Sequence, residues 1–265
     1  MAGFQIDRIA DGAWSVLDAG QASFYVLEGT ERAAVIDTGI TMGGKIMPVI
    51  RGLTDKPLVL VITHAHIDHF HHMDEFDTVY MSHREFEMPR AFLEGMFAGK
   101  HLDLKRTIDI TTGSVIDLGG DTLEICAVPG HTPGSVAVLD TGRNIVFTGD
   151  AIGSGSGVLL QLEGCVPLTE YLVSLRAFLK WLVDRGGAMR FYGGHHFQPF
   201  TSRLIRGWNP LSMGLLCDLI DLTEGVVNGT IVGRPCDERM YRGTTRPLYA
   251  TYGRAELMYS PESVR

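Results

Sequence analysis

The first third of the chain alternates between short apolar runs and turn residues. Residues 13–18, 23–27 and 33–36 are largely apolar or β-branched, and the glycines at positions 20, 29 and 39 punctuate them. Runs of this length bounded by glycine are typical of β-strands. A short helix is predicted over 43–53. The following run, 57–63, is apolar almost throughout, which indicates a strand covered on both faces.

Helical periodicity is clearest in the second half. Residues 167–184 start with a proline and then repeat apolar side chains every three or four positions, at Leu172, Leu175, Phe178, Leu179 and Leu182. Further helices are predicted over 82–100 and 211–226. Strands are expected at 122–128, 136–139, 145–147 and 190–192, and the tail at 240–260 alternates like a hairpin around Gly253.

Strands followed by a helix, in two successive halves, predict an α/β fold. We expect a four-layer helix–sheet–sheet–helix (αββα) sandwich forming one domain over 1–265, with a core at about 13–200 and a C-terminal helix-plus-hairpin extension at about 201–265. The chain has 265 residues, of which 45% are hydrophobic. A chain of this size can bury a sufficient core without disulfide bonds.

Charge and composition restrict the partners. The formal net charge is −8 and no basic stripe occurs, which argues against nucleic acid. No apolar run approaches the roughly 20 residues that span a bilayer, and the first residues do not resemble a signal peptide. The four cysteines form no CxxC pair. We therefore expect a cytoplasmic protein that acts on a small molecule, and association into a homo-oligomer stays open.

Metal-ligating residue types gather directly after the strand at 57–63. Within six positions the chain carries His64, His66, Asp68 and His69. Imidazole and carboxylate groups are the ligands expected for zinc, iron or manganese. A solvated histidine-rich loop is the alternative, and the neighbouring histidines at 71 and 72 would suit it.

Three further candidates also follow predicted strands. His131 lies in GHTPGS, Asp150 ends TGD, and His195 lies in YGGHH. A rigid sheet can aim side chains that project from loops at the ends of its strands. Singly, each of these is an ordinary surface, core or turn residue. Together with the first cluster, they indicate a metal site.

These segments, between about 20 and 196, resemble the metallo-β-lactamase-fold superfamily of metallo-hydrolases. The resemblance includes VIDTG at 35–39 and implies the αββα sandwich. It implies two divalent ions, with zinc expected first and iron or manganese as alternatives. The first ion is assigned to His64, His66 and His131, and the second to Asp68, His69 and His195, with Asp150 bridging them. Asp37 is implied to support the metal pocket without binding a metal.

The resemblance also implies a reaction. A hydroxide held between the two ions would attack a carboxylic ester, lactone or thioester, as in glyoxalase-II-like thioesterases and lactonases. Asp68 would pass a proton to the leaving group, and His196 is a candidate proton donor, with a supporting or surface role as its alternative. Gly153 stands where acyl-homoserine-lactone lactonases usually carry a tyrosine. True β-lactamases generally carry Cys or Ser at the place of Asp150, so we expect no such enzyme here.

Other functions remain compatible with the same ligands. The fold also supports phosphodiester cleavage, for which a small molecule is the expected substrate, and related proteins with a single iron oxidise persulfides. A purely structural metal is disfavoured, because structural zinc sites are usually closed by four ligands, often cysteines. Met88, Phe92, Met96 and Phe97 could form an apolar lid over an acyl group or could pack in the core.

Overall fold

The computed structural model describes residues 3–18, 22–41, 44–96, 106–153, 157–195, 211–236 and 246–265. Over these ranges the first sheet has seven strands in sequence order: β1 (Gln5–Ala10), β2 (Ala13–Leu17), β3 (Ser23–Glu28), β4 (Ala33–Ile36), β5 (Leu58–Val61), β6 (Val79–Met81) and β7 (Thr107–Asp109). The pairs from β1 to β4 are antiparallel and those from β4 to β7 are parallel.

The second sheet has the strand order β13-β11-β10-β9-β8 in the described ranges. Its strands are β8 (Val115–Asp117), β9 (Thr122–Ala127), β10 (Val136–Asp140), β11 (Ile145–Phe147) and β13 (Arg190–Tyr192). The β11–β13 pair is parallel and the others are antiparallel. The loops that follow β9, β11 and β13 carry predicted metal ligands.

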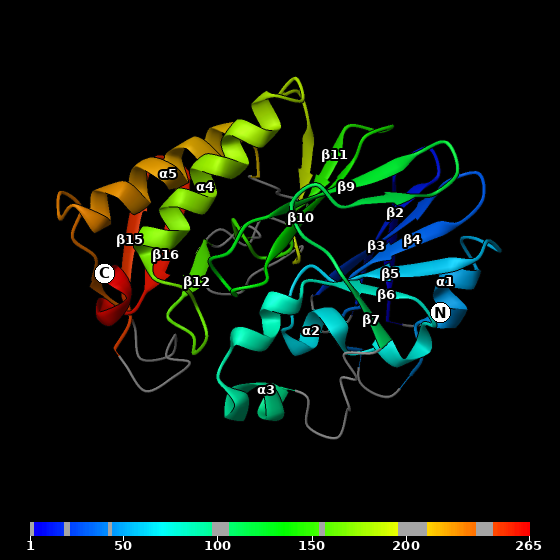
Figure 1. Ribbon diagram of the computed structural model, residues 1–265, viewed down its shortest axis with the longest axis horizontal. Helices are drawn as coiled ribbons and strands as arrows, with labels where there is room; N and C mark the ends of the chain where they lie inside the picture. Colours follow the sequence, from blue (N-terminus) through cyan, green and yellow to red (C-terminus); the bar gives the residue numbers. More distant parts are fainter. Residues whose placement is uncertain are drawn as a thin grey trace.

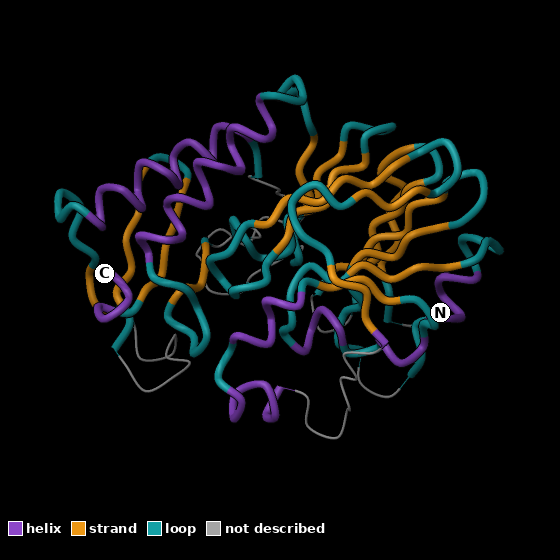
Figure 2. The backbone as a smooth tube through the Cα atoms, viewed as in Figure 1, coloured by secondary structure: helices purple, strands orange, loops and turns teal. Residues whose placement is uncertain are grey.

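The two sheets pack face to face, with helices outside both (Figures 1 and 2). Side chains alternate along each strand, so one strand supplies two layers of core. In β3, Phe24 and Val26 pack toward the helices, whereas Tyr25 and Leu27 pack toward the second sheet. Three separate hydrophobic clusters result, as four stacked layers require. The αββα prediction is confirmed.

The helices divide between the outer faces. The helices α1 (Met47–Arg51), α2 (Ile67–Phe70) and α3 (Arg90–Met96) lie on the side of the first sheet, with two 3-10 turns, η1 (Met73–Glu75) and η2 (His83–Glu87). The helices α4 (Leu168–Val183) and α5 (Met213–Val227) run side by side over the other face (Figure 1). A last 3-10 turn, η5 (Pro261–Val264), ends the chain.

The C-terminal helix and hairpin extend the second half of the molecule. A third sheet of order β12-β16-β15-β14 joins β12 (Val158–Leu160) to β14 (Arg234–Pro235), β15 (Leu248–Tyr252) and β16 (Ala255–Tyr259). The β12–β16 pair is parallel, and through it a strand of the core is hydrogen-bonded directly to a strand of the extension. Helix α5 packs on this sheet and shares one buried cluster with α4.

Two predicted helices are shorter than expected. The segment predicted at 43–53 is helical over Met47–Arg51, where the carboxylate of Glu75 accepts the N–H groups of Ile46 and Met47. The segment at 82–100 divides at Pro89 into η2 and α3, because proline lacks an N–H and disfavours a helical residue before it. Residues 97–100 lie outside the described ranges.

The described helices include none that combines the length and the apolar composition needed to cross a bilayer. All four cysteines are free thiols.

Candidate metal centre

The seven predicted ligands meet at one end of the two facing sheets. His64 and His66 follow β5, Asp68 and His69 lie in α2, and the other three follow β9, β11 and β13. Their ligand atoms form three groups in which every atom lies within 4.8 Å of the others: His64 with His66 and His131, His64 with His69 and Asp150, and Asp68 with His69 and His195.

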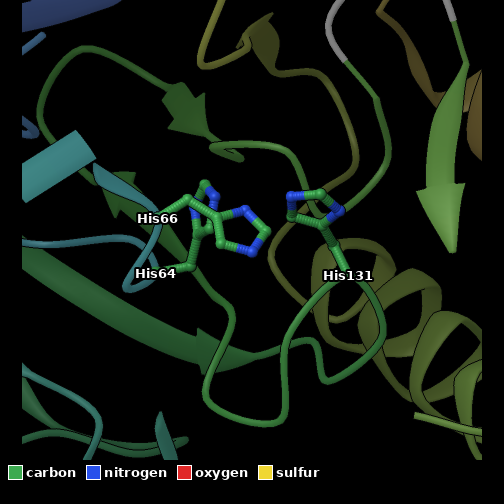
Figure 3. Close-up of side chains that lie close together, drawn as sticks. All are labelled: His64, His66 and His131. Atoms are coloured by element: carbon green, nitrogen blue, oxygen red, sulfur yellow. The ribbon is translucent and has the colours of Figure 1, made fainter. Parts of the chain in front are cut away.

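The first group consists of three imidazoles that face one another. Figure 3 shows the rings of His64 and His66 opposite that of His131, and the ring centroids lie 4.5–4.9 Å apart. The Nε2 atom of each is buried and has no hydrogen-bond partner among the described residues. Buried nitrogens are rarely left unpaired in this way, so the arrangement fits a cation.

The second nitrogen of several rings is held in place. His131 Nδ1 donates to the Leu159 carbonyl at 2.7 Å, and His69 Nδ1 lies 2.8 Å from Asp37 Oδ2. When Nδ1 carries the proton, Nε2 presents its lone pair to the site. These hydrogen bonds therefore select the tautomer that can bind a metal.

Asp37 orients two of the histidines. Its backbone has a φ of +59°, and its Oδ1 accepts the Thr63 N–H at 2.8 Å. Thr63 Oγ1 donates its proton to Asp37 Oδ2 at 2.7 Å, which leaves the hydroxyl oxygen to accept from His64 Nδ1 at 3.2 Å. Asp37 thus acts on His69 directly and on His64 through Thr63.

The carboxylate of Asp150 lies between the two assigned groups. Its Oδ2 is 3.7 Å from His131 Nε2, 3.8 Å from His69 Nε2 and 3.3 Å from His195 Nε2. Asp68 lies near the two histidines of the second group. Its Oδ2 is 3.4 Å from His195 Nε2, and its Oδ1 is 3.9 Å from His69 Nε2. One oxygen of Asp150 can therefore serve both groups.

Comparison of the sequence with models of protein families shows which family the chain belongs to. Residues 17–195 match the model of the metallo-beta-lactamase superfamily, and this span covers most of the chain and all seven predicted ligands. The chain belongs to this superfamily. The metallo-beta-lactamase fold implies divalent metal binding, and the histidine and aspartate groups described above are the candidate ligands.

Relatives within the metallo-beta-lactamase superfamily include thioesterases. The acyl-coenzyme A thioesterase MBLAC2 of Bos taurus is 28% identical over 219 residues, which are 70% of this chain and 77% of the relative. The hydroxyacylglutathione hydrolase of Mesorhizobium japonicum is 26% identical over 171 residues, 64% of this chain and 60% of the relative. A metallo-beta-lactamase from Pontibacter korlensis has a similar structure, with a TM-score of 0.61 and 20% identity, covering 83% of this chain and 99% of that one.

The three imidazoles of the first group favour the neutral form. Burial lowers the pKa of His64 and His131 below the usual value, and burial with the neighbouring His131 lowers the pKa of His66 to about 3. Metals bind the neutral imidazole, so these three rings need not lose a proton before they ligate.

The second group combines charges of opposite sign. Burial alone would raise the pKa of Asp68 and Asp150, but the nearby imidazoles of His69 and His195 hold both values below the usual range. Burial opposes protonation of His69, yet the carboxylates around it outweigh burial and raise its pKa to about 10. A metal ion at this group would therefore have to displace the proton on His69 Nε2. Two ionised carboxylates in a buried site favour a cation.

Two glycines let the loops approach closely. A Cβ at Gly194 would lie 2.4 Å from His69 Cε1 and 2.5 Å from Asp150 Oδ1. Gly149 has a φ of +49°, and a Cβ there would lie 2.4 Å from Thr63 Oγ1. A residue larger than glycine would displace His69 or Asp150 at position 194, and at position 149 it would displace Thr63, which contacts His64.

The remaining predicted site residues have mixed outcomes. His196 and Phe97 lie outside the described residues, as does the side chain of Met96. Phe92 in α3 lies beside the site, with its ring centroid 6.0 Å from that of His66. Met88 is buried in the cluster under the first sheet, so its lid role is not supported.

Sequence reasoning missed Thr63 and Glu85. Thr63 connects Asp37 to His64, and Glu85 is buried against the loop that carries His131. Neither residue stands in a distinctive spacing, because each acts through contacts between loops that are far apart in the sequence. Glu85 reads as one of several charges on an amphipathic segment.

Proposed function

We propose that this chain is a dinuclear metallo-hydrolase that cleaves a carboxylic thioester, with esters and lactones as the neighbouring substrate classes. His64, His66 and His131 would hold one ion and Asp68, His69 and His195 the other, with Asp150 shared. The position of Asp150 Oδ2, within 3.8 Å of a histidine nitrogen from each set, supports this assignment most strongly.

The donor set suits zinc first, with iron and manganese as alternatives, because imidazole and carboxylate bind all three. Two such ions supply a water of lowered pKa and polarise the substrate carbonyl. The chain's own contribution is orientation. The contacts with Asp37 and Leu159 fix the rings of His69 and His131 before a metal ion binds. Such preorganisation reduces the reorganisation needed during reaction.

Asp68 is the proposed proton carrier. Its side chain is 30% exposed, against 9% for Asp150, so its carboxylate is the one open to an incoming substrate. The nearby imidazoles keep it ionised and able to accept a proton, which it would return to the leaving group. His196 follows a proposed ligand in sequence and is the second candidate for proton donation.

The thioester preference rests on the named relatives, an acyl-coenzyme A thioesterase and a hydroxyacylglutathione hydrolase. The ring of Phe92 beside His66 would give an acyl group an apolar contact. A thiolate is also a good leaving group, which needs less help from an acid than an alkoxide does.

Metal analysis of the purified protein, together with turnover of a substrate panel, tests this function. The panel comprises thioesters, lactones, aryl esters and small phosphodiesters. We expect two divalent ions per chain, highest turnover on a thioester, and loss of activity on chelation that zinc, manganese or iron restores. One iron per chain with oxidation of a persulfide would overturn the proposal, as would full activity in verified metal-free protein.

A further inference from the structure

A buried carboxyl group lies behind the first group of histidines, outside the ligand set. Glu85 belongs to η2 and is fully buried. Its Oε1 accepts a hydrogen bond from Thr132 Oγ1 at 2.6 Å, and Thr132 directly follows His131. Ser135 Oγ lies 2.7 Å from the same hydroxyl and accepts the Thr132 N–H at 3.1 Å. Glu85 is therefore bonded into the turn that presents His131.

The same carboxyl packs tightly against the loop that carries His131. A Cβ at Gly134 would lie 2.7 Å from Glu85 Cγ, N and Oε1, so this loop touches Glu85 with no space to spare. Burial raises the pKa of Glu85 to about 7, while the Thr132 hydroxyl and the backbone N–H groups of Ala65 and Gly134 favour the ionised form. Ala65 stands between His64 and His66.

A carboxyl group is an unfavourable residue type at a buried position that only has to fill space. Burying a carboxyl group costs free energy that its hydrogen bonds must offset, whereas burying a hydrophobic side chain of similar size is favourable. The hydrogen bond of Glu85 to Thr132 and its close contact with Gly134 both belong to the loop that carries His131. A general packing role does not require this distribution.

We propose that Glu85 is a positioning residue that fixes the turn carrying His131, and so holds this imidazole at metal-binding separation from His64 and His66. The inference rests on the proposed metal site. Groups that orient metal ligands typically contribute a factor of about 10–100 in metal affinity. We expect Glu85 to act at this scale on the ion bound by His64, His66 and His131.

Co²⁺ titration of the metal-free full-length protein measures this role, with visible absorption reporting ligand geometry and chelator competition giving affinity. The variants are Glu85→Gln, which removes the charge and one acceptor oxygen of the carboxylate, and Thr132→Val, which removes the hydroxyl that donates to it. Both change the side-chain volume little. Glu87→Gln is the matched control, because Glu87 lies in the same turn but is exposed and paired with Arg84. His131→Ala identifies the spectral component that belongs to the first ion.

We expect Glu85→Gln to weaken one Co²⁺ ion by about 10–100-fold and to alter the spectral component that His131→Ala removes. Thr132→Val should act in the same direction, and the double variant should be less affected than the product of the two single effects. Glu87→Gln should match the wild type in affinity and spectrum.

Wild-type affinity and spectrum in Glu85→Gln, with a lowered melting temperature, would reduce Glu85 to a packing role and overturn the inference. If Glu85→Gln does not fold, the same unchanged readings in Thr132→Val overturn it. A wild-type protein that takes up no Co²⁺ would instead contradict the proposed function, so the two failures are distinguishable.

Discussion

Asp37 shows how much of this site depends on one side chain that binds no metal. Its backbone is in the left-handed region, where aspartate is tolerated better than most residues, and its two oxygens receive three hydrogen-bonding groups from Thr63 and His69. Both proposed ions are affected, because His64 and His69 belong to different sets. The carboxylate acts as the common support for the two.

Replacing Asp37 should therefore weaken metal binding without removing a ligand. We expect Asp37→Ala to lower metal affinity by about 10–100-fold, because His69 and Thr63 lose the acceptor that orients them. Chelator competition on the purified variant measures this change. Asp109→Asn is a suitable control, since Asp109 also accepts a backbone N–H, from His83, but lies away from the site. Unchanged affinity in Asp37→Ala would restrict Asp37 to forming its turn.

His195 is expected to be a ligand of the second ion. His195→Ala should lose one metal per chain and most turnover, because its Nε2 lies near both Asp68 and Asp150. His83→Ala should retain both, since His83 Nε2 contacts Thr107 Oγ1 in another part of the fold. Metal counts by mass spectrometry compare the variants. Two ions retained in His195→Ala would point to His196 as the ligand.

At the residue scale, the sequence indicated the candidate ligands that the fold brings together, because metal ligation restricts residue type and spacing at the same time. Three histidines and an aspartate in six positions leave few other interpretations. Thr63 and Glu85 carry no such constraint. Their roles come from partners 26 and 47 positions away, and only the folded arrangement of the loops shows them.

At the scale of elements, α4 supports two of the ligand-bearing loops at once. Tyr171 Oη donates to the carbonyl of Ala151 at 2.6 Å, next to Asp150, and Ser174 Oγ donates to the carbonyl of Pro129 at 2.7 Å. The Tyr171 ring also lies directly against Gly130, where a Cβ would be 2.2 Å from Cδ2. Helix α4 thus holds the loops that carry His131 and Asp150 in position over the second sheet.

Adding one methyl group at Gly130 should disturb this contact. We expect Gly130→Ala to destabilise the fold by about 1–3 kcal/mol, the usual cost of overpacking, and to weaken the ion at His131. Urea unfolding of the metal-free protein gives the first quantity and chelator competition the second. In the Tyr171→Leu background the same substitution should cost less, whereas Tyr171→Phe keeps the ring and should give no relief. Equal costs in all three backgrounds would contradict the contact.

Elements that are defined by local interactions were predicted more accurately than elements that depend on residues far away in the sequence. Helix α4 and strands β11 and β13 were predicted to within two residues, because their apolar patterns are local and continuous. Strands β6 and β7 have three residues each and were missed, since pairing with neighbours rather than composition makes them strands. The start of α1 depends on Glu75, a contact that no local pattern contains.

At the scale of the whole molecule, the C-terminal extension is connected to the metal centre. Strand β16 pairs with β12, and the carbonyl of Leu159 in β12 accepts the proton of His131 Nδ1. The sequence predicted a helix and hairpin after the core, and α5 with β15 and β16 confirm it. It did not predict the third sheet, because β12 and β16 are separated by nearly 100 residues and pair in a register set by packing on α5.

Shared architecture does not by itself imply β-lactam cleavage. The metallo-beta-lactamase of Pontibacter korlensis is similar in fold at 20% identity, which says nothing about substrate. What differs is charge and space at the centre: Asp150 places a carboxylate oxygen between the two groups of histidines, where Cys or Ser is expected in an antibiotic-degrading enzyme. A shared carboxylate would add one negative charge and favour closely spaced ions.

We therefore expect negligible hydrolysis of penicillins and carbapenems by the wild-type chain, measured by loss of β-lactam absorbance beside a thioester assay on the same preparation. Asp150→Ala should lower thioester turnover by orders of magnitude and release the second ion at lower chelator concentration than the first. The asymmetry arises because three neutral imidazoles would still hold the first ion, whereas the second would keep two imidazoles and the partly exposed Asp68. Efficient cleavage of a carbapenem, or simultaneous loss of both ions from Asp150→Ala, would show that Asp150 does not have this role.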